Sequence, residues 1–131
     1  MILDNLLKEM CERGASDLFI RSGVAPSLRV DGVIELMDQP ALAAEDVEAI
    51  ARNMMDDQQA AEFAAKPELD VAIGVRGLGR FRVNLFRQRG SVGMVLRYVP
   101  NPQFDFQSLC LPPAVKVLSE RRRGLILVTG T

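Results

Sequence analysis

The sequence predicts an α+β domain in which helices pack on one face of a mainly antiparallel sheet. Two observations predict this fold class. The expected elements follow the order of strands, then helices, then a run of three strands, and consecutive strands with no helix between them favour antiparallel pairing. The length of 131 residues suits one ordinary domain with a single core.

The first part of the chain is predicted to form one helix and then three strands. Apolar residues follow a helical period over residues 2–11, and Gly14 suits the C-terminal end of that helix. The segment SDLFIRSG has the composition of a short strand. An Asp-Gly pair at 31–32, which is typical of tight hairpins, then joins two further strands.

The middle of the chain returns to a helical period after Pro40. The apolar positions of the first helix here share one face and are Val47, Ile50, Ala51 and Met54. Acidic residues at the start of this helix are stabilised by the positive end of the helix dipole. Asp56 and Asp57 are expected to begin a second short helix that buries Phe63.

Alternating residues return after the second short helix. Three consecutive strands are predicted in the segments ELDVAIGV, GRFRVNLFRQ and VGMVLRYV. A connection limited by prolines follows, with one helix from about Pro113 to Ser119. A final strand is expected from Leu125 to Val128.

The composition predicts a soluble globular protein, with 48% apolar and 25% charged residues. The apolar runs are far shorter than the roughly 18 residues that span a bilayer, and no export signal is visible. A cytoplasmic location is therefore expected. Cys11 and Cys110 are the two cysteines and there is no histidine, so no metal site is predicted and both thiols are expected to be reduced and packed.

The net charge of −1 conceals an uneven distribution along the chain. Residues 1–75 carry 6 Lys and Arg against 15 Asp and Glu, whereas residues 76–131 carry 10 against 2. Such a division suits an anionic ligand on the basic half, or acidic surfaces of one copy docking on basic surfaces of another. Two solvated faces of one domain would give the same distribution.

Arginines recur in the predicted hairpin of the last two long strands. If Arg89 and Gly90 form a two-residue turn, one face of the strand pair is entirely apolar and Arg82 lies directly opposite Arg97 on the other face. Like charges opposite one another destabilise a sheet. Two adjacent guanidinium groups suit an anion that accepts forked hydrogen bonds, such as phosphate. The alternative is a solvated face of a half-exposed sheet.

The end of the chain has part of a phosphate-binding motif. A P-loop requires a strand followed by GxxxxGK[ST], and here Gly130 would be its first glycine, with no lysine after it. The sequence alone therefore gives no working phosphate cradle. The triplet at 121–123, Arg-Arg-Arg, is interpreted as solvated charge, with nucleic acid as the alternative.

Three segments together carry a family resemblance: ASDLFIRSGVAPSLRVDG, GRFRVNLFRQRGSVGMVLRYVP and RRRGLILVTGT. They resemble the N-terminal region of the type IV pilus retraction ATPases, the twitching-motility branch of the secretion-ATPase superfamily, over residues 1–131. Phe19 stands where many members of the main retraction-motor subgroup carry histidine. The chain is therefore more similar to the accessory, PilU-type paralogue.

The resemblance implies three parts in a bacterial parent protein. Residues 1–100 would be a PAS-like N-terminal domain, residues 101–123 a connection to the motor domain, and residues 124–131 the first strand and truncated start of the P-loop of a RecA-like ATPase domain. The chain is then expected to be a fragment, ended by design or by proteolysis, that is itself inactive and binds no cofactor. The parent would bind ATP and Mg²⁺ and form a hexamer.

The resemblance also implies a role. The domain would regulate and pack a ring that powers pilus retraction and twitching motility. Arg82 and Arg97 match the family's arginines that reach the ATP phosphates, and Gly130 and Thr131 match the start of Walker A. Implied partners are other copies, a related retraction ATPase and the inner-membrane pilus platform protein, with no nucleic acid. The implied location is cytoplasmic, peripheral at the inner-membrane pilus base.

Two other classes of function remain open from the sequence. One is a PAS-like sensor that binds a small molecule in its core, and the other is a purely structural oligomerisation domain without nucleotide contact. A bound ligand would favour the sensor. ATPase activity that does not depend on Arg82 or Arg97 would favour the structural domain.

Overall fold

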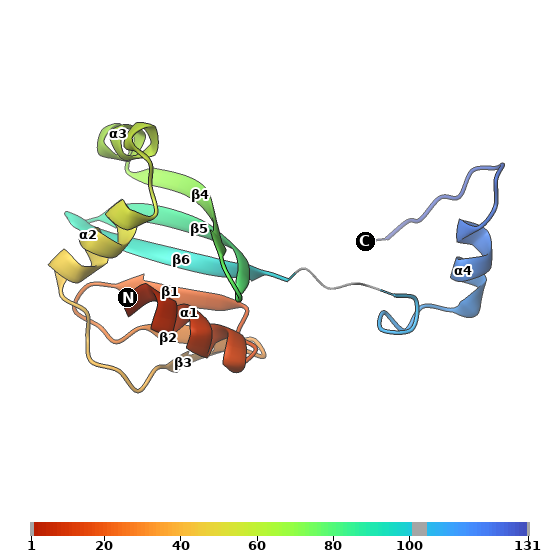
Figure 1. The fold of residues 1–131 in the computed structure, drawn as a ribbon, viewed down its shortest axis with the longest axis horizontal. Coiled ribbons are helices and arrows are strands. Elements are labelled where there is room, and N and C mark those ends of the chain that lie inside the picture. The colour runs from red at the N-terminus through yellow and green to blue at the C-terminus, as the bar shows by residue number, and fades with distance from the viewer. Residues whose placement is uncertain (1, 101–104, 131) are drawn as a thin grey trace. The chain divides into compact units, whose positions relative to one another are not determined.

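The computed structural model describes residues 2–100 and 105–130 and divides the chain into two compact units, Met1–Asn101 and Pro102–Thr131 (Figure 1). The elements of the first unit are, in chain order, α1 (Ile2–Glu12), β1 (Asp17–Arg21), β2 (Ser27–Val30), β3 (Val33–Leu36), α2 (Ala44–Asn53), α3 (Asp57–Ala65), β4 (Glu68–Val75), β5 (Gly79–Gln88) and β6 (Ser91–Val99). The second unit contains α4 (Pro113–Ser119).

The six strands form one antiparallel sheet in the order β3-β2-β1-β6-β5-β4. Each half of this sheet is a run of sequential neighbours, and the two halves meet where β1 pairs with β6. The predicted α+β class with a mainly antiparallel sheet is therefore confirmed. The first and last strands of the unit lie side by side at its centre (Figure 1).

Helices α1 and α2 lie on the same side of this sheet, and α3 lies beside β4 (Figure 1). In α1 the stripe of Leu6, Leu7 and Met10 is fully buried. Gly14 has φ +62°, a left-handed conformation that costs glycine little and stops the helix as predicted. At the start of α3, Asp56 and Gln59 form a reciprocal capping box, since each side chain accepts a hydrogen bond from the other residue's backbone N–H.

The core lies between these helices and the apolar face of the central strands. Its sheet residues alternate along β1, β5 and β6 and are Leu18, Ile20, Phe81, Val83, Leu85, Met94 and Leu96. All seven are fully buried. The alternation confirms the predicted apolar face of the β5–β6 hairpin, because every second residue points toward the helices.

Two tight turns set the strand registers. Asp31 and Gly32 have φ values of 48° and 83°, and Arg89 and Gly90 have 53° and 81°. Positive φ at both central residues is the geometry of two-residue turns whose twist matches that of the flanking strands. The predicted turn at Arg89 and Gly90 is therefore confirmed, and it fixes Arg82 opposite Arg97.

The second unit has no buried residue among those described. Its first turn is closed by Asp105 and Ser108, because the Ser108 backbone N–H donates to Asp105 Oδ1 at 2.6 Å. α4 occupies the predicted span. The prediction of a strand at Leu125–Val128 was wrong, since the structure assigns no regular element there. These four residues are 51 to 93% exposed, and an apolar strand forms only where another strand pairs with it.

The two cysteines differ in environment. Cys11 is half-buried against the core, as expected, but Cys110 is exposed, so the prediction that both are packed was wrong for Cys110. No helix in the described part of the chain is long and apolar enough to cross a membrane.

Candidate anion-binding site on the open face of the sheet

The face of the sheet opposite the helices is called the open face below. It presents the alternate side chains of three adjacent strands, β1, β6 and β5. They are Asp17, Phe19 and Arg21 of β1, Arg80, Arg82, Asn84, Phe86 and Gln88 of β5, and Ser91, Gly93, Val95, Arg97 and Val99 of β6. Most of these side chains are polar or charged and are exposed or half-buried. The face is therefore a solvent-facing surface rather than a second core.

A row of three charged residues crosses the open face. Arg97 is the cross-strand partner of Arg82 on one side and of Asp17 on the other. The predicted cross-strand pairing of Arg82 with Arg97 is thus confirmed. The structure adds the carboxylate of Asp17, which offsets the repulsion between the two arginines. We call Asp17, Arg29, Arg82 and Arg97 the arginine site.

Asp17 is the buried anchor of the arginine site, with only 4% of its surface exposed. Its Oδ1 accepts a hydrogen bond from Nε of Arg97 at 2.9 Å, and its Oδ2 accepts one from the Ser16 hydroxyl at 2.9 Å. Nε of Arg29 lies 3.2 Å from the same Oδ2. Both carboxylate oxygens are therefore satisfied, which is the condition for burying a charge.

These partners keep Asp17 ionised. Burial alone would raise the pKa of its carboxyl group. The hydrogen bonds from Arg97 and Ser16 and the positive charges of Arg97 and Arg29 outweigh burial, so the pKa of Asp17 lies below its ordinary value. Asp17 is thus an anion around neutral pH that holds two cations.

The two arginines that face each other keep donors for a ligand. Arg97 uses Nε to bind Asp17, and its side chain is 70% exposed, so both Nη groups can donate elsewhere. The exposed side chain of Arg82 makes no hydrogen bond or ion pair with any residue that the structure describes. Together they offer the forked, planar donors that bind phosphate or carboxylate oxygens.

A hollow of about 360 Å³ lies over the arginine site. It is lined by Asp17, Asp70, Arg82, Asn84, Val95 and Arg97. Nδ2 of Asn84 donates to Glu68 at 2.8 Å and to Asp70 at 3.3 Å, so these two β4 carboxylates are held at the β4 side of the hollow. Arg82 and Arg97 are the cationic side chains in the lining of the hollow.

The other predicted site residues belong to the second unit. Gly130 is exposed and has no regular secondary structure, and Thr131 lies outside the described residues. Within the part of the chain that is described, no three His, Cys, Asp or Glu side chains gather to hold a metal ion.

Sequence reasoning missed Asp17 and Arg29. The available signal for Asp17 was a carboxylate in the otherwise apolar strand segment DLFI. Its partner could not be identified, because the pairing of β1 with β6 joins residues 80 positions apart. Arg29 reaches Asp17 from β2, where these two residues are cross-strand partners.

Comparison with known proteins identifies similar chains. The chain is 40% identical over 130 residues to the type IV pilus ATPase PilU of Pseudomonas aeruginosa, and 36% identical over 130 residues to the type IV pilus retraction ATPase PilT of the same organism. Both matches cover 99% of this chain. The crystal structure of the pilus retraction motor PilT with bound ADP matches 96% of this chain with a TM-score of 0.82 and 42% identity.

The chain spans about a third of the length of these relatives: 34% of PilU, 38% of PilT and 37% of the PilT chain in the crystal structure. No family model matches it.

Proposed function

We propose that this chain, which is homologous over its whole length to the type IV pilus ATPases PilU and PilT, is the N-terminal regulatory and ring-packing domain of an ATPase that retracts type IV pili. The observation that carries the proposal is the structural match to PilT with 42% identity over 96% of this chain. The matched third of the PilT chain suits one domain of a larger motor.

Arg82 and Arg97 are proposed to donate to ATP phosphates across a domain or subunit boundary. Three features support this role: the two arginines face each other, their guanidinium donors are free toward the hollow, and Asp17 orients Arg97. Positive charge brought to the phosphates on a moving element stabilises the charge that develops during hydrolysis. The site would then act as an arginine finger that is complete only when the ring subunit closes.

The rest of the phosphate chemistry is assigned to a RecA-like motor domain. Residues 1–100 would be the regulatory domain, 101–123 the connection, and 124–131 the first strand and start of the P-loop, with Gly130 and Thr131 as its first residues. ATP and Mg²⁺ would bind there, and the magnesium ion would neutralise phosphate charge. In that setting a partner strand in the motor domain would let residues 125–128, which form no strand in this chain, complete the predicted strand.

The wider role follows from the same proposal. Six copies would form a ring at the cytoplasmic side of the inner membrane, where the pilus platform protein and a related retraction ATPase are partners. ATP turnover would drive the twitching motility that pilus retraction powers. The acidic half and the basic half of the chain give complementary surfaces for packing between copies.

The PilU-type subgroup and the PAS-like character of the domain remain predictions. The identities to PilU and PilT are close, 40 and 36%, so the assignment to the accessory, PilU-type group rests on Phe19. The PAS-like character of the domain likewise rests on the resemblance seen in the sequence.

The test is ATP hydrolysis by the ATPase that contains this chain and its motor domain. Arg82→Ala and Arg97→Ala are each expected to lower kcat on the order of 1,000-fold, the lower end for an arginine finger. Arg80→Ala is the matched control, because Arg80 lies on the same strand and the same face opposite Val99, and it should leave kcat unchanged. Unchanged kcat in all three variants would reject arginine donation and favour a structural or sensor domain.

A further inference from the structure

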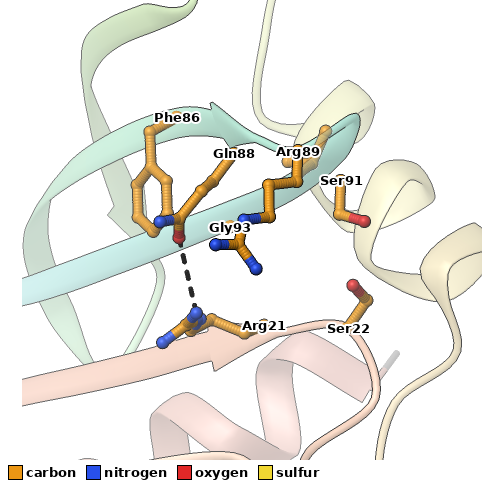
Figure 2. A pocket seen from close by; sticks show the side chains of 8 residues that line it. Arg21, Ser22, Phe86, Gln88, Arg89, Ser91 and Gly93 are labelled. Atoms are coloured by element: carbon orange, nitrogen blue, oxygen red, sulfur yellow. Dashed lines mark hydrogen bonds between the residues drawn. The ribbon is translucent and has the colours of Figure 1, made fainter.

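We propose a second anion-binding site, a pocket for a phosphate group at the turn end of β5 and β6. It is independent of the arginine site. The pocket has a volume of about 240 Å³ and is lined by Arg21, Ser22, Phe86, Gln88, Arg89, Ser91, Val92 and Gly93 (Figure 2). We call it the turn pocket.

Two arginines from different strands share the turn pocket. Arg21 ends β1, and Arg89 is the first central residue of the β5–β6 turn, where its positive φ fixes the direction in which the side chain leaves the backbone. Figure 2 shows both guanidinium groups directed into the same space, and Ser22 and Ser91 also line the pocket. The pocket therefore gathers the donors of two guanidinium groups, with two serine side chains in its lining.

The charge in the turn pocket is not neutralised by the protein. No carboxylate lines it, and neither Arg21 nor Arg89 forms an ion pair among residues 2–100 and 105–130. Within the described residues, Arg21 donates only to Gln88 Oε1, at a long 3.4 Å. The neighbouring Arg87, in contrast, is 3.6 Å from Glu48. Two cations that share one hollow without an anion favour an anionic ligand from outside.

The contact between Phe86 and Gly93 forms one apolar wall of the turn pocket. The ring of Phe86 lies against Gly93 so closely that a Cβ at Gly93 would be 2.6 Å from Phe86 Cζ. Because glycine stands there, the ring can lie across β6 and form an apolar wall beside the charged groups. Small-molecule sites usually have roughly 300–1,000 Å³. The turn pocket is smaller, so it fits a phosphate group rather than a whole nucleotide.

The turn pocket is separate from the arginine site. Arg21 pairs with Gly93, whereas Asp17 pairs with Arg97, four residues further along β6. Four residues of an extended strand span about 13 Å. Phe19 and Val95 lie between the two sites on the open face. A phosphate group can therefore bind here whether or not Arg82 and Arg97 reach a nucleotide.

The experiment uses this chain and inorganic phosphate at constant ionic strength, followed by ¹⁵N–¹H spectra of the arginine Nε–H groups and the turn amides. Saturable shifts of Arg21 and Arg89 are expected. Arg21→Gln and Arg89→Gln should each weaken binding about 10-fold or more, since each removes a charge-assisted donor. Ser91→Ala, which keeps the charge, should weaken binding by a smaller factor.

Two control variants separate this site from general charge and from the arginine site. Arg76→Gln removes a positive charge in the β4–β5 turn, away from the pocket. Arg82→Gln removes a donor of the arginine site. Neither should change the phosphate affinity measured at Arg21 and Arg89. Equal weakening by Arg76→Gln, or no saturable shift, would overturn the proposal.

A parallel arm distinguishes a free phosphate from one carried on a lipid. Cosedimentation is measured with phosphatidylcholine vesicles with and without phosphatidic acid. Binding to the anionic vesicles that is lost in Arg21→Gln and Arg89→Gln identifies a lipid headgroup as a source. Saturable phosphate shifts without vesicle binding identify a soluble ligand, and both results support the pocket.

Discussion

Replacing Asp17 by Asn tests the arginine site most directly, because it removes one negative charge and keeps the shape of the side chain. Asp17 is 4% exposed and accepts bonds from Arg97 and Ser16 while Arg29 lies 3.2 Å away. Removing one partner of a fully buried ion pair costs about 3–5 kcal/mol. Here the side chains of Arg29 and Arg97 are 38 and 70% exposed, so water can solvate them and the cost is smaller.

We expect Asp17→Asn to lower the free energy of unfolding by about 2 kcal/mol at pH 7, which is roughly the contribution of one charge-assisted hydrogen bond. For a unit of this size that corresponds to a Tm lower by roughly 8–16 °C. Urea unfolding and a thermal scan of the chain measure both quantities. Asp38→Asn is the matched control, because Asp38 is exposed, and it should stay within about 0.5 kcal/mol of the unchanged chain.

The pH dependence gives the same prediction a second readout. The pKa of Asp17 is lowered by folding, so its contribution to stability is present above the ordinary carboxyl pKa and is lost as pH falls through the lower folded value. The difference between the unchanged chain and Asp17→Asn should therefore shrink as pH falls below about 4. If Asp17→Asn is as stable as Asp38→Asn at pH 7, the ion-pair reasoning is refuted.

Two further predictions concern the close contact at Gly93 and the thiols. Gly93→Ala should lower the free energy of unfolding by about 1–3 kcal/mol, because the new methyl group meets the ring of Phe86. Gly74→Ala is the control and should not destabilise the chain, because a Cβ there has no atom within 4 Å. Urea unfolding of both variants measures the difference. Iodoacetamide should label Cys110 before Cys11, because Cys110 is exposed. The pKa of the Cys11 thiol is raised, mainly by burial and also by the negative charge of Glu12, which leaves less of the reactive thiolate. Peptide mass spectrometry over time measures the order, and faster labelling of Cys11 would contradict it.

Local patterns in the sequence were enough to predict the hairpin that carries the two arginines. The alternation of apolar residues along β5 and β6 fixes which side chains share a face, and the turn at Arg89 and Gly90 fixes the register. Both signals act over a few residues. Arg82 and Arg97 could therefore be placed opposite each other before the structure was known.

The rest of the arginine site depends on contacts between distant segments. Asp17 contributes through the pairing of β1 with β6, which no local period encodes. The predicted strand at 125–128 failed for a related reason: its composition favours a strand, but a strand needs a partner to accept its backbone hydrogen bonds. Composition predicts what a segment can form, and its neighbours decide whether it does.

The order of strands has a consequence for how the domain folds. β1, β2 and β3 are joined by short loops, as are β4, β5 and β6, so each half of the sheet closes between near neighbours in sequence. The β1–β6 junction instead closes a loop of roughly 70 to 80 residues, and the entropy cost of loop closure rises with length. Such non-local pairing slows folding and is expected to form after the hairpins.

The arginine site lies on that late junction, with Asp17 on one half of the sheet and Arg97 on the other. A chain with both hairpins formed but the junction open has two arginines side by side and no carboxylate to hold them. On the proposed function, the hydrogen bond by which Asp17 orients Arg97 forms only with this junction, and an anion bound there would stabilise the closed sheet.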